Sequence, residues 1–199
     1  MAESSSLVRY VGLGHEAADG VPPYLQDFSN REGTRLMTKC RLNYLMLMES
    51  VARILKWPAA GAKCVMCDTD AIESLMHFLC SCPAPEPCRA RFDREVGAAL
   101  GQAGEPGAEL LRVLSGSDDQ RVQALLGAAE LVSEGDDLLS DLCAKARWML
   151  DKLAKNFVMA CWRLREALVG KLSIEHQTLH HSPSEASVER LLAQQGDWQ

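Results

Sequence analysis

Apolar residues recur at three- and four-residue steps along most of this chain, the spacing that places side chains on one face of an α-helix. The longest such run covers residues 136–169, and it predicts one long helix that Gly170 closes. No segment alternates apolar and polar residues in the way that a half-buried strand does. The pattern therefore predicts an all-α fold, with further helices over 31–42, 86–100, 110–116 and 119–133.

A few residues set the predicted helix boundaries. Ser29 and Glu32 have the spacing of a capping box, which predicts that the first helix begins directly after them. The apolar period continues to Trp57, so the pattern fits either one helix over 31–57 or two helices with a break near Asn43. Three glycines predict a loop ahead of the 110–116 helix, namely Gly101, Gly104 and Gly107.

The chain divides into three parts by composition. Residues 1–28 mix glycine, serine, proline and acidic residues without a sustained period, and they predict an irregular arm. Residues 29–169 form the predicted helical domain, which contains a cysteine-rich finger at 62–85. Residues 170–199 predict a polar loop and a short terminal helix. A chain of 199 residues is long enough for the domain to bury a hydrophobic core.

The finger carries metal-ligand side chains in the pattern C-x2-C-x9-H-x4-C, supplied by Cys64, Cys67, His77 and Cys82. Two cysteines separated by two residues lie on a tight turn that points both sulfurs at one ion. A soft dication such as zinc takes four thiolate or imidazole ligands in a tetrahedron. The sequence therefore predicts one bound Zn²⁺. It is also compatible with a short β-hairpin, a zinc knuckle, within the finger. Four protein ligands with no open position describe a structural site rather than a catalytic one.

The fourth ligand has two candidates. Apolar residues around His77 recur at helical spacing, which predicts a short helix there; they are Ile72, Leu75, Met76 and Leu79. Cys80 follows His77 by three residues and shares its face of that helix. Cys82 follows His77 by five residues, and Pro83 directs the chain out of the helix. This geometry favours Cys82, and Cys80 is the alternative fourth ligand.

The finger resembles the zinc-binding region near the C-terminus of non-LTR retrotransposon reverse transcriptases. The resemblance rests on the ligand pattern together with Glu73, Leu79 and the pair Cys82–Pro83. The interval from Cys67 to His77 is slightly longer than is usual in that family. Flanking segments extend the resemblance over residues 28–168; they are Thr34–Lys39 and Arg41–Asn43 before the finger, and Arg89–Phe92 and Trp162–Arg165 after it.

The resemblance implies handling of template RNA or target DNA and a nuclear location. It does not extend to polymerase chemistry, because the paired-aspartate motif is absent and 199 residues cannot hold a palm and fingers. What it implies is a retrotransposon-derived nucleic-acid-binding module without catalysis.

The charge of the chain is segregated along its length. The net charge of −6 argues against nucleic-acid binding by the whole surface. Residues 34–63 nevertheless carry six basic residues and one acidic residue, and 144–171 carry seven basic and two acidic ones. These stretches and the helix after the finger supply the predicted nucleic-acid contacts: Arg35, Lys39, Arg41, Lys63, Arg89 and Arg91, with Trp57 as a stacking surface.

A second hypothesis fits the same residues. Residues 106–141 hold eight acidic side chains against two basic ones, and the long amphipathic helix offers a face for another protein. Under this hypothesis zinc only stabilises the fold, and the chain is a structural or protein-interaction subunit of a larger assembly. The basic stretches are then solvated outer faces of amphipathic helices.

Other functional classes find little support. The chain lacks the H-E-x-x-H pattern of zinc hydrolases and the Gly-Lys-Ser/Thr of a phosphate loop, so we expect neither an enzyme nor a small-molecule substrate. His176, His180 and His181 are typical of a solvated loop.

The opening residues lack the order of a secretory signal and no run of apolar residues is long enough to span a membrane, so we expect an intracellular protein. Outside the finger the cysteines fall at core positions: Cys40, Cys88, Cys143 and Cys161.

Overall fold

The computed structural model describes residues 30–127 and 137–175, and the regular structure in these ranges is helical. The predicted all-α fold is therefore confirmed. The predicted arm, the terminal helix and the three histidines lie outside the described residues. The helices are α3 (Arg31–Arg41), α4 (Met48–Leu55), α5 (Glu86–Leu100), α6 (Gly104–Leu114), α7 (Asp118–Leu125) and α8 (Asp137–Glu175), with a 3₁₀ turn η1 (Ala59–Ala62) and a π-helical turn η2 (His77–Ser81).

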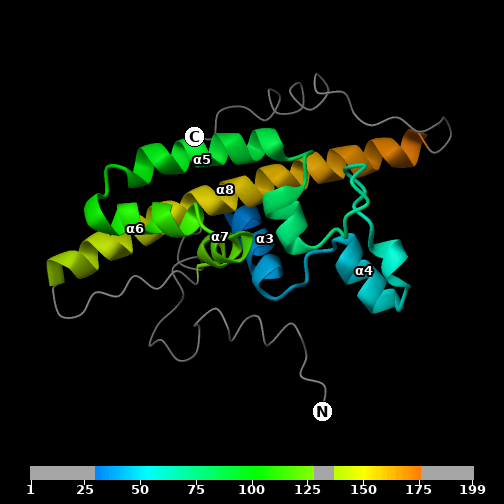
Figure 1. Cartoon of the computed structure of the whole chain (residues 1–199), viewed down its shortest axis with the longest axis horizontal. Coiled ribbons are helices and arrows are strands. Elements are labelled where there is room, and N and C mark those ends of the chain that lie inside the picture. Colours follow the sequence, from blue (N-terminus) through cyan, green and yellow to red (C-terminus); the bar gives the residue numbers. More distant parts are fainter. Residues whose placement is uncertain (1–29, 128–136, 176–199) are drawn as a thin grey trace, which may run out of the picture.

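Helix α8 braces the domain, and α5, α6 and α3 pack along it (Figure 1). It has 39 residues and therefore spans about 58 Å. Its buried stripe includes Phe157, whose ring stacks on Phe92 of α5 with the centroids 4.8 Å apart. The predicted end at Gly170 is wrong, because α8 continues through this glycine to Glu175. A glycine costs a helix about 1 kcal/mol relative to alanine, which is too little to stop one of this length.

The segment after Asn30 forms two helices rather than one. Asn30, not Ser29, is the N-cap of α3, since its Oδ1 accepts a hydrogen bond of 2.7 Å from the backbone N–H of Gly33. Helix α3 ends at Arg41, and Asn43 then adopts a left-handed conformation with φ of 53°. Asparagine tolerates this conformation better than most residues. The alternative with a break near Asn43 is the correct one.

Two glycines that predict a loop instead belong to α6. Gly104 starts the helix with φ of 67°, a value that favours glycine. Gly107 lies within the helix, where an added Cβ would come within 2.0 Å of the backbone oxygen of Leu100 at the end of α5. The glycines therefore allow α5 and α6 to meet closely, and the predicted loop is limited to residues 101–103. Helix α7 begins with a capping box between Ser117 and Gln120 and ends at Leu125, earlier than the period predicts.

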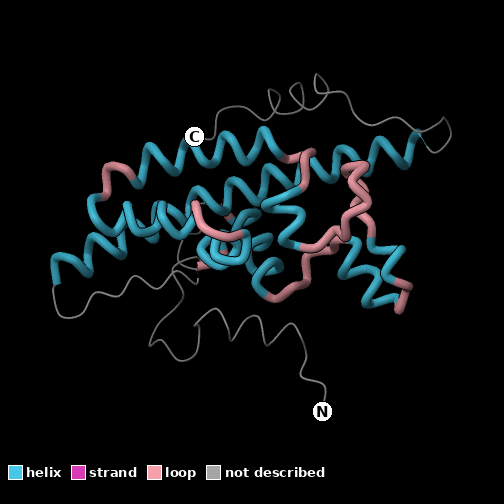
Figure 2. Tube along the Cα trace, in the orientation of Figure 1, coloured by secondary structure: helices cyan, strands magenta, loops and turns pink. Residues whose placement is uncertain are grey.

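The finger is part of the main core. Its residues Leu75, Phe78, Leu79 and Cys82 are each at most 2% exposed, and they join the same buried cluster as Phe157. The turn η2 contacts both α7 and α8. Figure 2 shows the loops of the finger running between α4 and the body of the helical domain. Among the described residues, β pairing is limited to one antiparallel bridge between Lys63 and Ile72, so the expected knuckle hairpin is reduced to a single bridge.

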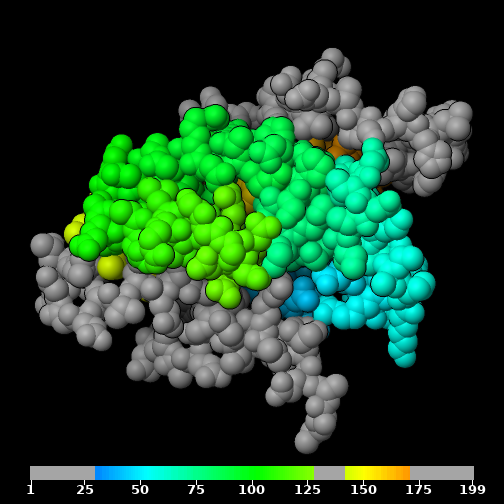
Figure 3. Space-filling view, viewed as in Figure 1, coloured from blue at the N-terminus to red at the C-terminus, as the bar shows by residue number. Residues whose placement is uncertain are grey.

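Exposed apolar side chains are concentrated on α4 and on the segments next to it in the chain. Helix α4 and η1 project from the body of the molecule (Figure 3), and only Ser50 and Ala52 of α4 are buried. Trp57, between the two elements, is 48% exposed and packs against Gly61. We call this surface the α4 patch; its exposed apolar side chains are Tyr44, Met46, Ile54, Leu55, Trp57 and Ile72.

In the part of the chain that the structure describes, every helix is too short or too polar to cross a membrane.

Candidate metal centre

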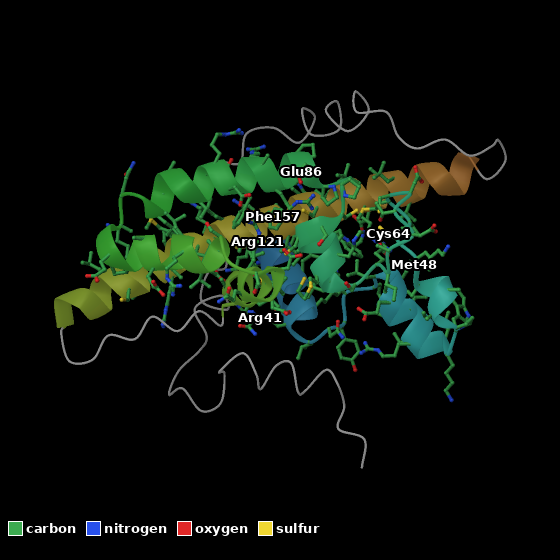
Figure 4. The ribbon with its side chains drawn as sticks, in the orientation of Figure 1. Arg41, Met48, Cys64, Glu86, Arg121 and Phe157 are labelled. Atoms are coloured by element: carbon green, nitrogen blue, oxygen red, sulfur yellow. The ribbon has the colours of Figure 1, made fainter. Side chains whose placement is uncertain are left out.

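The four predicted ligands of the finger meet at one point (Figure 4). The ligand atoms of Cys64, Cys67, His77 and Cys82 all lie within 4.8 Å of one another. The Sγ atoms of Cys64 and Cys82 are 3.8 Å apart, and Cys67 Sγ lies 3.4 Å from His77 Nε2. Residues separated by up to 18 positions in the chain thus form one compact cluster of three sulfurs and one nitrogen.

The spacing within the cluster suits a tetrahedral ion. With Zn–S bonds of about 2.3 Å and Zn–N bonds of about 2.0 Å, two sulfurs of a tetrahedron lie about 3.8 Å apart and a sulfur and a nitrogen about 3.5 Å apart. Two of the six separations in the cluster, 3.8 Å and 3.4 Å, match these edges, and all six are within 4.8 Å. All eight cysteines are free thiols, so no disulfide competes for the ligands. The donor set therefore fits one soft divalent cation.

The first two ligands are placed by a tight turn. Cys64 begins it, and its sulfur accepts a 3.5 Å hydrogen bond from the backbone N–H of Met66. The Cys64 N–H donates to the Ala71 carbonyl at 2.8 Å, and the Glu73 N–H donates to the Ala62 carbonyl at 2.8 Å. These bonds close the segment between Cys64 and Glu73 into a loop. Cys67 lies on this loop and faces His77.

The other two ligands are placed by a π-helical turn. In an α-helix, residues five apart point about 140° away from each other, so His77 and Cys82 would face different sides. Here the Cys82 N–H donates to the His77 carbonyl at 2.7 Å, the five-residue bond of a π-helix. This wider turn brings both side chains into the same cluster. Cys82 then leaves the helix in an extended conformation with ψ of 127°, ahead of Pro83.

Cys80 lies outside the cluster. Its thiol points toward α7 and lies 3.9 Å from the backbone carbonyl of Asp118, while the neighbouring Ser81 hydroxyl bonds the Asp118 carboxylate at 3.0 Å. Burial raises the pKa of the Cys80 thiol to about 11, and the nearby Asp118 carboxylate adds to the shift. A thiol with this pKa is protonated at neutral pH. The structure places Cys82, not Cys80, beside the other three ligands.

Within the cluster the sulfur of Cys64 is the one that favours the thiolate form. The pKa of Cys64 is lowered to about 5, chiefly by its hydrogen bond with Cys82 and further by the Met66 N–H, while burial opposes the shift. The pKa of Cys82 is raised by the same hydrogen bond and by burial. The two opposite shifts have one cause, the contact between the Cys64 and Cys82 sulfurs.

A buried ion pair fixes the finger to the helices. The Glu73 carboxylate, 0% exposed, accepts two hydrogen bonds of 2.8 Å from the Arg165 guanidinium of α8. It also accepts a 2.7 Å bond from the backbone N–H of Met48, the first residue of α4. One carboxylate therefore joins the finger, α4 and α8. The spacing of residues did not predict the ion pair between Glu73 and Arg165. The one feature of the sequence that pointed to it is that Glu73 is an acidic residue among the apolar residues before His77.

The predicted basic contacts fall into three groups. Arg41 and Arg89 are buried, at 1% and 6% exposed, and this rules out the surface role predicted for them. Arg41 (labelled in Figure 4) lies 3.9 Å from the Asp151 carboxylate, and Arg89 donates to Glu86 and to the backbone carbonyl of Cys82. Arg89 therefore supports a ligand of the cluster. A charged group is buried only where it gains such partners.

Two of the remaining cations make ion pairs at the surface. Lys63 pairs with Asp70 at 2.6 Å, and Arg91 pairs with Glu95 at 2.8 Å. The Lys63 ammonium holds the pKa of the Asp70 carboxyl below its usual value. Arg35 is exposed and Lys39 is half-buried; they lie four residues apart on α3, and neither makes an ion pair with another described residue. The cysteines outside the finger are buried, as predicted: Cys40, Cys88, Cys143 and Cys161; Cys80 is half-buried.

Comparison with protein families, with curated proteins and with solved structures finds no match to this chain. The functional argument therefore rests on the geometry of the cluster and on the surfaces around it.

Proposed function

We propose that this chain is a non-catalytic nucleic-acid-binding module whose finger is stapled to its helices by one structural zinc ion. The observation that carries the metal assignment is the convergence of Cys64, Cys67, His77 and Cys82 at tetrahedral spacing. Three thiolates and an imidazole favour zinc over hard cations such as Mg²⁺ and Ca²⁺. With four protein ligands the ion would order the finger and leave no position for a substrate.

Nucleic acid is the proposed partner because α3 keeps two cations that are not buried and because the finger resembles that of retrotransposon reverse transcriptases. Arg35 and Lys39 share one face of α3, where both guanidinium and ammonium groups can approach phosphate. The burial of Arg41 and Arg89 reduces the number of phosphate contacts. We therefore expect weak binding with a shallow dependence on salt, rather than the steep dependence of a strongly basic protein.

Replacement of Arg35 and Lys39 by glutamine together is expected to weaken binding to RNA or DNA. Two lost phosphate contacts should reduce the slope of log affinity against log salt by about 1.4 for a single strand and about 1.8 for a duplex. Zinc content and helicity should not change, because neither residue belongs to the ligand cluster or to the buried core. Fluorescence anisotropy at several salt concentrations measures the slope.

Arg112→Gln is the matched control for that experiment. Arg112 is also a surface cation, with a side chain 71% exposed, but it lies on α6 and pairs with Glu109. Its replacement should leave affinity and slope as in the unmodified protein. If the unmodified protein binds neither RNA nor DNA at low salt, the nucleic-acid proposal is wrong.

The α4 patch favours a second candidate, a protein-interaction module with the same metal centre. Six large apolar side chains between Tyr44 and Ile72 are each at least 46% exposed, and a concentration of exposed apolar side chains in one part of the chain favours a protein contact. Contacts made through apolar side chains persist at high salt, whereas phosphate contacts weaken.

The test of this candidate is a substitution within the patch. Ile54→Asp together with Leu55→Asp should abolish binding of a protein partner that is retained at high salt and after nuclease treatment. The same pair should leave RNA and DNA affinity within about twofold, because a charge change of this size at a distance is screened by salt. Loss of nucleic-acid affinity with retention of the protein partner would count against this assignment of the patch.

A further inference from the structure

A cleft of about 460 Å³ lies between α5 and α8, which run side by side (Figure 1). None of the four cluster ligands lines it. Its walls include the aromatic ring of Trp148, the apolar side chains of Met149 and Leu153, and the polar groups of Arg91, Lys152 and Asn156. Small-ligand sites in proteins have volumes of about 300–1,000 Å³ and a similar mixture of apolar walls and a few polar groups.

The indole of Trp148 is the largest apolar group in the cleft. It is 49% exposed, although the neighbouring Leu150 on the same helix is 4% exposed. An indole that is held in a cleft with half of its surface in water offers a face for stacking. Every nucleobase has a planar face that stacks on such a ring, so the interaction tolerates any sequence.

Cations lie beside this ring. The Lys152 ammonium, one helical turn further along α8, is 5.8 Å from the centre of the indole ring. That distance is near the outer limit of a cation–π contact, so the ammonium is weakly held and can turn to a phosphate. Arg91 faces it from α5 and pairs with Glu95 at 2.8 Å. The charged side chains lining the cleft are thus two cations and one anion.

The cleft also adjoins the start of α3, the helix that carries Arg35 and Lys39. Asn156, in the cleft wall, accepts a 2.7 Å hydrogen bond from the side chain of Asn30. Asn30 is the N-cap of α3, so the helix with Arg35 and Lys39 begins at this wall. A strand bound in the cleft therefore has a second group of cations within the same domain.

We propose that the cleft between α5 and α8 binds one base of single-stranded nucleic acid, stacked on Trp148, with the adjoining phosphate facing Lys152 and Arg91. The proposal rests on the nucleic-acid function proposed above and assigns its site. A single strand is specified because a base in a duplex is stacked between its neighbours and cannot present its face to the indole. RNA and DNA share this chemistry, and both are tested.

Fluorescence anisotropy with labelled 12-nucleotide oligo-U and oligo-dT, and with a duplex of the same length, tests this site in the full-length protein. A stacked base is worth about 1–3 kcal/mol by alanine substitution, so Trp148→Ala should weaken single-strand binding by about 5- to 150-fold. Trp148→Phe should retain most of the affinity. Lys152→Gln should reduce the salt slope for a single strand by about 0.7.

Trp57→Ala tests the competing site, because the sequence predicts Trp57 as the stacking surface; this ring is also 48% exposed but lies in the α4 patch rather than the cleft. It should change single-strand affinity by less than about twofold. Trp148 is at the surface, so zinc content and circular dichroism should be unchanged in every variant. If Trp148→Ala fails this folding check, the double variant Trp148→Phe with Lys152→Gln takes its place.

The possible results separate the two proposals. If the unmodified protein binds no nucleic acid at low salt, the proposed function fails and this site fails with it. If it binds but Trp148→Ala has no effect, or Trp57→Ala has the larger effect, the cleft is not the site and the proposed function stands. Equal affinity for the duplex and the single strands, unaffected by Trp148→Ala, also overturns the assignment. A preference between oligo-U and oligo-dT identifies which nucleic acid the site takes.

Discussion

Cys82→Ser is expected to abolish zinc binding and to unfold the finger, whereas Cys80→Ser should leave both nearly unchanged. Cys82 lies in the cluster, with its sulfur 3.8 Å from that of Cys64, while the Cys80 thiol faces α7. Structural zinc sites supply about 10–16 kcal/mol of apparent binding free energy in finger peptides, so loss of one ligand removes a large part of the finger's stability. Native mass spectrometry measures the metal, and circular dichroism measures the folding.

The position of the finger in the core extends the effect of metal loss. Phe78 and Leu79 of the π-helical turn are each 0% exposed and share the main core with residues of α8. We therefore expect chelation to increase hydrogen exchange in the finger and also in the part of α8 that faces it. If the finger only contacted the surface of the domain, hydrogen exchange in α8 would not change after chelation. Zinc retention by Cys82→Ser with loss in Cys80→Ser would show that the ligand assignment is wrong.

Glu73→Ala is expected to destabilise the protein by about 3–5 kcal/mol, because it leaves the Arg165 guanidinium buried without its carboxylate. Glu73 is 0% exposed and bonds both Arg165 and the backbone of Met48, so its loss affects the finger, α4 and α8 together. Domains of this size are stable by about 5–15 kcal/mol in total, and the change is large on that scale. Urea unfolding with zinc present measures it.

Glu32→Ala is the matched control for this experiment. Glu32 also pairs with an arginine of α8, Arg163, at 2.6 Å, but the two side chains are 39% and 43% exposed. An exposed pair contributes about 0–1 kcal/mol. The double variant Glu73→Ala with Arg165→Ala should be more stable than the sum of its single variants predicts, since no charge is then buried alone. A loss below about 1 kcal/mol in Glu73→Ala would contradict the central role of this carboxylate.

Periodicity predicted the helical class because burial on one side of a helix requires an apolar residue at each turn, whatever that side faces. The stripe along α5 predicted the bounds of that helix, and the stripe along α8 predicted where that helix begins but not where it ends. Glycines were the weak point. Gly170 lies in open space within α8, whereas Gly107 is required by the approach of α6 to the Leu100 carbonyl. The sequence shows the glycine in both cases but not the neighbour that decides its role.

The metal cluster was predictable because ligand spacing is a local property: a C-x2-C turn and a following His and Cys need few residues between them. The choice between Cys80 and Cys82 needed the π-helical turn, which sequence spacing alone does not distinguish from an α-helical one.

The sequence by itself determined the helical class, the helix that spans the domain and the residue types that form the metal cluster, because each depends on residues close together in the chain. The tertiary structure decided the remainder. It placed Arg41 and Arg89 in the interior beside Asp151 and Glu86, although composition made them surface cations. It paired Glu73 with Arg165 across 92 positions and brought Arg91 to the same cleft as Trp148. A sequence shows how many charged side chains a chain carries. Which of them reach the surface depends on burial and on ion-pair partners, and both result from packing between distant segments.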